Sequence, residues 1–186
     1  MAIFITSDQH FNHINALNLM HDSRPFSSVN EMNEALINNW NDVISKNDEV
    51  YVLGDFIMGA AEGVQPILDR LNGRIHLIIG NHDTQSKLDI YKANDIDCQY
   101  GYVLKSHKID IVMSHYPVCD SLLDESYHDN HLPNRIFLYG HVHNEAPYGI
   151  HHCNCYHVGV DTNNLIPVKL DDIIYQYKIL INNFEQ

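Results

Sequence analysis

The sequence predicts an α/β protein with a sheet of parallel strands and helices packed outside it. Three apolar segments in the first half of the chain (2–7, 50–53 and 75–79) each have the pattern of a buried strand, and a helix-like segment follows each of them. A short polar cluster ends each strand, and in open α/β sheets ligands bind beyond the carboxyl ends of the strands. We therefore expect the functional groups to collect at one edge of the sheet.

The composition is that of one globular domain covering residues 1–186, with 45% hydrophobic residues. A formal net charge of -13 counts against binding to long nucleic acids or to anionic membranes. No apolar run approaches the roughly 18 residues that a membrane span needs, and the first residues lack the basic region of a signal peptide. The four cysteines do not suggest a disulfide scaffold, so we expect a cytoplasmic protein.

The polar clusters at the three strand ends carry groups that can bind metal or move protons. Asp8 and His10 are two residues apart, so in an extended segment their side chains point the same way. Gly80 allows a tight turn or a close approach of the backbone to a bound group. In chain order, the clusters are Asp8-Gln9-His10, Gly54-Asp55 and Gly80-Asn81-His82-Asp83.

Helices are expected between these strands and after them. The best marked helix begins after Ser28, which can form a capping box with Glu31, and its apolar stripe includes Trp40. The other segments with a helical pattern are 16–21, 64–71 and 86–92.

After residue 92 the pattern changes to closely spaced strands. Segments 99–105 and 109–113 are expected to form antiparallel strands, and 136–139 is a further strand. Segments 156–160 and 173–181 are expected to be closing strands. Two of them lead into further histidines, His115 and the cluster Gly140-His141-Val142-His143. Residues 118–134 form a long polar connection, and loops of that length often act as lids or determine specificity.

Five strand-end clusters in this order resemble the calcineurin-like metallophosphoesterase superfamily. The resemblance runs from Asp8 to His143, and the segments 11–15 and 24–26 look like a small bacterial or phage-type branch. It implies a four-layer α/β/β/α sandwich, in which two mixed sheets pack face to face between helices, with two metals at one edge. Residues 54–59 read Gly-Asp-Phe-Ile-Met-Gly, which departs from the Ser/Thr protein phosphatase pattern Gly-Asp-x-Val-Asp-Arg-Gly and counts against that group.

The resemblance also implies a role for each cluster. Asp55 would bridge the two metals, His82 would lie beside them as the general acid, and Asp83 would orient His82. The remaining ligands would be Asp8, His10 and His143 for one metal, and Asn81, His115 and His141 for the other.

The chemistry of these residue types agrees with that implication. Carboxylate and imidazole ligands suit Mn, Fe, Ni, Co or Zn, and we expect two divalent ions, with Mn first among them. Two ions about 3.5–4 Å apart can clamp a phosphoryl oxygen and make hydroxide available near neutral pH, while a histidine protonates the leaving oxygen. We expect hydrolysis of a phosphomonoester or phosphodiester bond in a small phosphorylated substrate. The alternatives are a metal-bearing binding scaffold without catalysis, and a nuclease or nucleotide pyrophosphatase.

Some residues outside the clusters have two interpretations. His13 lines the pocket or lies on a helix face, and Arg24 contacts phosphate or is a surface residue ahead of a proline. The stretch 151–157 is a strand flanking the site or a separate zinc site. Asp161-Thr162 is interpreted as a turn.

Overall fold

Two mixed five-stranded sheets form the centre of the structure, a computed structural model that describes residues 1–118, 134–146, 149–151 and 154–184. In the first sheet β1, β2, β3 and β4 run parallel in that order, and β10 pairs antiparallel with β1. The three strands predicted in the first half of the chain are therefore neighbours, with their carboxyl ends at one edge. The strands are β1 (Ile3–Thr6), β2 (Glu49–Val52), β3 (Arg74–Ile78), β4 (Asp97–Gln99) and β10 (Val168–Lys169).

The second sheet has the order β5-β6-β7-β9-β8, in which β6, β7 and β9 run parallel and the two outer strands run antiparallel to their neighbours. A parallel bridge between Ser7 and Gly159, just beyond β1 and β9, joins the carboxyl edges of the two sheets. The strands are β5 (Gly101–Ser106), β6 (Ile109–Ser114), β7 (Arg135–Tyr139), β8 (Ile150–His151) and β9 (Cys155–His157).

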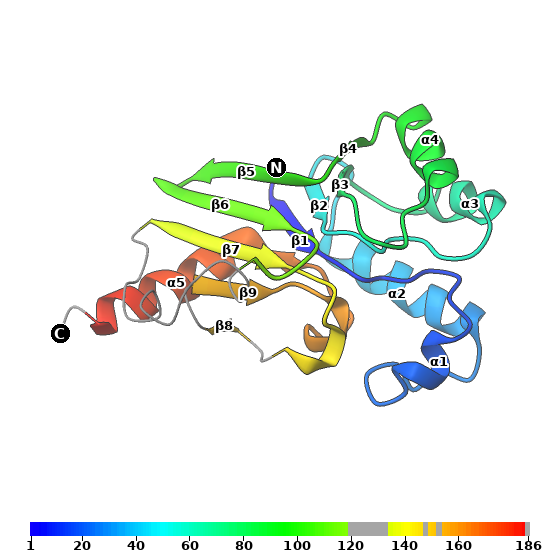
Figure 1. Ribbon diagram of the computed structural model, residues 1–186, viewed down its shortest axis with the longest axis horizontal. Coiled ribbons are helices and arrows are strands. Elements are labelled where there is room, and N and C mark those ends of the chain that lie inside the picture. Colours follow the sequence, from blue (N-terminus) through cyan, green and yellow to red (C-terminus); the bar gives the residue numbers. More distant parts are fainter. Residues whose placement is uncertain (119–133, 147–148, 152–153, 185–186) are drawn as a thin grey trace.

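Helices flank the sheets, and α2, α3 and α4 lie on the side of the first sheet that faces away from the second (Figure 1). Helix α2 begins as predicted, because the Ser28 side chain accepts the backbone N–H of Glu31 at 3.2 Å. The helices are α1 (Ala16–Leu19), α2 (Val29–Val43), α3 (Val64–Leu68), α4 (Gln85–Ala93) and α5 (Leu170–Phe184), with short 3-10 turns η1 (Ala61–Gly63), η3 (His143–Glu145) and η5 (Val160–Thr162).

Two hydrophobic clusters hold these layers together. Successive strand residues point to opposite faces, so Val50 packs with Trp40 under the helices, whereas Ile5 packs with Ile111 and Leu138 between the two sheets. The predicted fold class, two mixed sheets packed face to face with flanking helices, is confirmed.

Two element predictions are wrong. The segment 173–181 lies in helix α5, because its buried residues Ile173, Ile174 and Tyr177 recur at helical spacing, whereas Tyr175 is 67% exposed. The isoleucines favour a strand by composition, but their period is that of a helix. The predicted strand 99–105 is divided between β4 of the first sheet and β5 of the second, where the chain crosses from one sheet to the other.

Within the described ranges, none of the helices combines the length and apolar character needed to cross a membrane. Cys98 is a free thiol, whereas Cys155 is disulfide-bonded, which the cysteine count alone did not indicate.

Candidate metal centre

The ends of five strands meet where the carboxyl edges of the two sheets adjoin. The backbone N–H of His141, after β7, donates to Asp8 Oδ2, after β1, at 2.9 Å. Here histidine and aspartate side chains form two groups, and within each group the potential ligand atoms lie within 4.8 Å of one another. The first group is Asp8, His10 and His143, and the second group is Asp55, His115 and His141.

The first group contains buried polar atoms that the described residues leave without a hydrogen bond. Asp8 Oδ2 accepts from Ser7 Oγ and from the backbone of His141, but Asp8 Oδ1 and both ring nitrogens of His10 have no partner. Burial lowers the pKa of His10 to about 2, so its imidazole is neutral, and burial raises the pKa of Asp8 to about 6. A neutral imidazole whose Nε2 lies 3.9 Å from an unpartnered carboxylate oxygen fits a divalent cation as the missing partner.

Asp55 lies between the two groups. Its Oδ2 is 3.6 Å from His115 Nε2 in the second group and 3.7 Å from His10 Nε2 in the first group. Its Oδ1 accepts the backbone N–H of His82 at 2.8 Å, which holds the carboxylate in this orientation. This is the position that a bridging ligand requires.

The second group is also oriented toward a cation. His115 Nδ1 lies 2.7 Å from the carbonyl oxygen of Leu53, and because a carbonyl only accepts, Nδ1 carries a proton; in the neutral imidazole Nε2 then has the lone pair. Nε2 then faces Asn81 Oδ1 at 2.9 Å. The two atoms are close enough for both to contact one cation.

The backbone of the site adopts a conformation that residues other than glycine rarely adopt. Five of the six members of the two groups have φ in the left-handed region, which costs about 1–3 kcal/mol each and is concentrated at functional sites. The angles are 59° at Asp8, 49° at His10, 53° at Asp55, 73° at His141 and 49° at His143.

Two glycines let the chain approach these groups closely. A Cβ at Gly80 would collide with Asp55 Oδ1, and a Cβ at Gly140 would collide with Ser7 and with Asp8 Oδ2. Glycine is therefore required at both positions by the carboxylates themselves.

His82 lies beside the two groups but belongs to neither. Its side chain is 47% exposed, and its Nε2 is 4.0 Å from Asp55 Oδ2. Its ring stands edge-on to that of His10 at 5.6 Å between centroids. An exposed imidazole at this distance can reach a bound substrate.

Asp83 does not point at the His82 imidazole, which corrects its expected role as an orienting partner of that ring. Its Oδ2 accepts the backbone N–H groups of Asp55 and Gly80, both at 2.9 Å, and its Oδ1 accepts that of Phe56 at 3.3 Å. These backbone donors would otherwise be buried without a partner. Asp83 therefore ties the turns after β2 and β3 together.

The same turn is also held from α4. Lys87 is buried, and its ammonium donates to the carbonyl of His82 at 3.0 Å. The backbone of His82 is thus fixed on both sides, while its imidazole remains accessible.

Arg24 is not available to a substrate, which corrects its prediction as a phosphate contact. Its side chain is fully buried, and the guanidinium donates to both carboxylate oxygens of Asp161 and to the carbonyls of Asp8 and Gln9. The remaining donor faces the sulfur of Met32 at 3.9 Å.

Asp161 is a site residue that the sequence pattern did not reveal. It was interpreted as part of a turn, and it does lie in η5, but its Oδ2 is 2.8 Å from His143 Nδ1. Burial alone would raise the pKa of Asp161, yet the hydrogen bonds from His143 and Arg24 hold that pKa below its ordinary value.

A cavity of about 420 Å³ opens beside the first group. His13 lines it, and its ring stacks on His10 with 5.1 Å between centroids, which agrees with the pocket interpretation of His13. The described residues that line the cavity include neither lysine nor arginine; they are His10, His13, Leu19, Met20, His82, His141, Val142, His143, Asn144 and Glu145.

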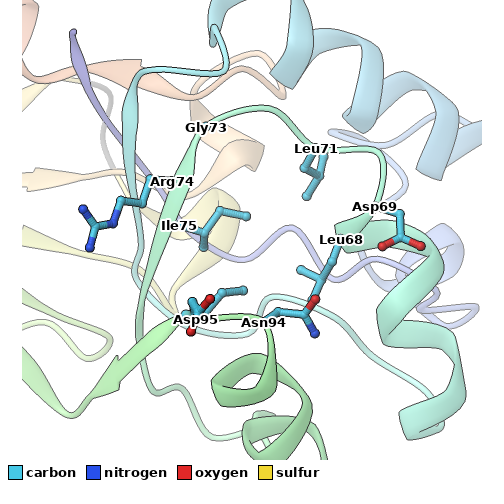
Figure 2. Close-up of a pocket in the computed structure, with 9 residues that line it drawn as sticks. Leu68, Asp69, Leu71, Gly73, Arg74, Ile75, Asn94 and Asp95 are labelled. Carbon is cyan, nitrogen blue, oxygen red and sulfur yellow. The ribbon is translucent and has the colours of Figure 1, made fainter.

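A larger cavity of about 640 Å³ lies at the opposite, amino end of β3 (Figure 2). Leu68 and Ile75 line it, and the Arg74 side chain points away from the space between them. No member of the two groups lines this cavity. The stretch 151–157, considered above for a separate zinc site, lies partly outside the described residues.

Comparison with known proteins agrees with this geometry. Residues 1–156 match the family model described as the calcineurin-like phosphoesterase superfamily domain. An uncharacterized protein of Methanocaldococcus jannaschii, MJ1445, is 35% identical over 179 residues, covering 92% of this chain and 89% of that protein. The gene 66 protein of Mycobacterium phage L5 is 27% identical, covering 85% and 86%. A crystal structure of a protein of unknown function from Aquifex aeolicus, AQ665, has the same fold, with a TM-score of 0.71, 23% identity and coverage of 94% and 98%.

Proposed function

Because this chain belongs to the calcineurin-like phosphoesterase superfamily, we propose that it is a hydrolase of phosphomonoester or phosphodiester bonds that works with two divalent ions. The observation that carries the proposal is the position of Asp55 Oδ2, less than 4 Å from a histidine of each group, at 3.6 Å and 3.7 Å. One oxygen so placed can be shared by two ions.

The donor set supports the metal part of the proposal. Carboxylate, imidazole and amide oxygen donors suit Mn, Fe, Ni, Co or Zn, and we propose Mn as the first ion to test. When bound, two such ions withdraw charge from phosphoryl oxygens and lower the pKa of water. Asp8 Oδ1 and the ring nitrogens of His10 have no hydrogen-bond partner in the part of the chain that the structure describes, so they can bind an ion without first breaking another contact.

The proton that the leaving oxygen needs would come from His82. The imidazole is half-exposed, lies outside both groups, and is held by its own backbone, which donates to Asp55 and accepts from Lys87. The imidazole can therefore lie beside the leaving oxygen while the backbone that carries it stays fixed. General acid catalysis of this kind contributes roughly 10²–10⁴-fold to the rate.

The cavity favours a small substrate over a long polyanion. Its volume of about 420 Å³ suits a small phosphorylated molecule. The formal net charge of -13 and the lack of lysine and arginine among the described lining residues give no attraction for a long nucleic acid. The bound ions would supply the positive charge that one phosphate group needs.

A hydrolysis screen of the Mn-loaded protein tests the proposal. The substrates are a bis-aryl phosphodiester, an aryl phosphomonoester and nucleotides, each assayed with Mn-loaded and metal-free protein. The matched variants are His82→Ala and His107→Ala, since His107 is an exposed histidine in the turn between β5 and β6, far from the carboxyl edges of the sheets. We expect turnover that requires metal, falls in His82→Ala and is unchanged in His107→Ala. Metal uptake without turnover of any substrate would favour the binding scaffold.

A further inference from the structure

A buried ion pair lies directly behind the first group. Arg24 and Asp161 both have fully buried side chains, and they contact each other through two hydrogen bonds, Nε to Oδ1 at 2.8 Å and Nη2 to Oδ2 at 2.9 Å. The proposed reaction does not use either side chain. Burying two charges is costly, so a pair retained in this position calls for a reason.

One end of the pair controls the His143 ring. Asp161 Oδ2 lies 2.8 Å from His143 Nδ1, and because an ionised carboxylate can only accept, Nδ1 must carry the proton. In the neutral imidazole, Nε2 is then the lone-pair nitrogen of His143. Such a carboxylate–histidine contact fixes both the tautomer and the orientation of a metal-binding imidazole.

The other end of the pair controls the chain between the remaining members of the first group. Arg24 Nη2 donates to the carbonyl of Asp8 at 2.6 Å, and Nη1 donates to the carbonyl of Gln9 at 2.7 Å. Gln9 separates Asp8 from His10, and both of those residues have the left-handed backbone described above. These two hydrogen bonds therefore support the conformation that brings Asp8 and His10 to the site.

The second group is built differently. His115 Nδ1 is bound by the backbone carbonyl of Leu53, not by a carboxylate. Arg24 and Asp161 make none of their hydrogen bonds to Asp55 or His141. The ion pair thus supports the first group and not the second group.

We propose that Arg24 and Asp161 are positioning residues of the first group, which preset the His143 tautomer and the backbone at residues 8–10 and thereby set the affinity of that group for a divalent ion. They do so without contacting the ion. The inference rests on the proposed function, because it assumes that both groups hold metal. Loss of such an outer partner typically weakens metal binding by about 10–100-fold.

Asp161→Asn tests this directly, with Asp48→Asn as the matched control. Asp48 is also buried and also accepts backbone hydrogen bonds, from Ala2 and Ser45, but it lies at the amino end of β2, away from both groups. Calorimetric titration of the metal-free proteins with Mn²⁺ should show two binding steps in the wild type and in Asp48→Asn. In Asp161→Asn one step should weaken by about 10–100-fold while the other is unchanged.

A second measurement determines the tautomer in the wild-type protein, and a variant serves only to assign the signals. Long-range ¹H–¹⁵N spectra of the Zn-loaded wild-type protein report the tautomer of each histidine, and a His143→Gln sample identifies the His143 signals. We expect His143 to be protonated at Nδ1 and coordinated through Nε2.

The outcomes separate this inference from the proposed function. Two unchanged binding steps in Asp161→Asn, or a His143 ring protonated at Nε2, would overturn the positioning role and leave the proposed function standing. A wild-type protein that takes up no divalent ion would overturn both.

Discussion

Replacing Asp83 by asparagine removes one acceptor from a carboxylate that binds three backbone N–H groups. Asparagine can keep the two shorter bonds, to Asp55 and Gly80, both at 2.9 Å, but its NH₂ group then faces the N–H of Phe56, which the wild-type Oδ1 accepts at 3.3 Å. One buried donor is left without a partner, which costs about 1–3 kcal/mol. Burial raises the pKa of Asp83, so the neutral amide also escapes part of the cost of a buried charge. We therefore expect Asp83→Asn to lower the free energy of unfolding by about 1–3 kcal/mol.

The consequence for activity follows from the same contacts. The turns after β2 and β3 carry Asp55 and His82, so loosening them should lower kcat by a similar factor for good and poor leaving groups. The assays are urea unfolding of the metal-free protein and hydrolysis of two aryl phosphates that differ in leaving-group pKa, with Asp48→Asn as the control for a buried carboxylate elsewhere. Suppose instead that Asp83→Asn unfolds like the wild type and loses activity mainly with the poorer leaving group. Asp83 would then act on the His82 imidazole, and the backbone role argued here would be refuted.

Three further predictions concern the site and the fold. Asp55→Asn should lower the content of both metal ions, because Asp55 Oδ2 lies near both groups; elemental analysis that finds wild-type metal content would contradict a shared role. His82→Ala should keep its metal and lower kcat by roughly 10²–10⁴-fold, less with a nitrophenolate leaving group, and loss of metal would instead make His82 a ligand. Ile173→Ala, on the buried face of α5, should lower the free energy of unfolding by about 2–5 kcal/mol, whereas Ile179→Ala, 45% exposed on the same helix, should change it far less; equal losses in urea unfolding would contradict the assignment of the helix faces.

The location of the site could be predicted because its signal is local. Each ligand cluster directly follows an apolar strand, and parallel strands bring their carboxyl ends to one edge. Gly80 and Gly140 belong to this signal, since a side chain at either position would collide with a carboxylate of the site. The strand pattern predicted this edge for the first three clusters, and the resemblance to the calcineurin-like superfamily implied the same edge for His115, His141 and His143.

The support of the site could not be predicted, because it depends on contacts between distant segments. Arg24 and Asp161 are 137 positions apart, and Asp161 and His143 are 18 apart, so no local spacing marks them. In the sequence, an arginine before a proline is typical of the surface. Only the fold shows that the Arg24 guanidinium is buried and that its N–H groups are hydrogen-bonded within the protein. Asp83 shows the same limit. It follows His82 in the sequence, but its carboxylate accepts the backbone N–H groups of Asp55 and Phe56.

The fold was predicted where the hydrophobic period was clear and missed where composition and period disagreed. The buried residues of α5 follow a helical period, but the isoleucines among them favour a strand by composition. The crossing from β4 to β5 was hidden because two short strands of different sheets are separated only by Tyr100.

The most direct test of the central claim is an anomalous difference map from crystals of the Mn-loaded protein. Two arrangements of donor atoms, one on each side of Asp55, should each hold an ion. We predict two peaks about 3.5–4 Å apart, one in contact with Asp8, His10 and His143 and the other in contact with His115 and His141, with Asp55 touching both. A single peak, or peaks away from these residues, would contradict the account.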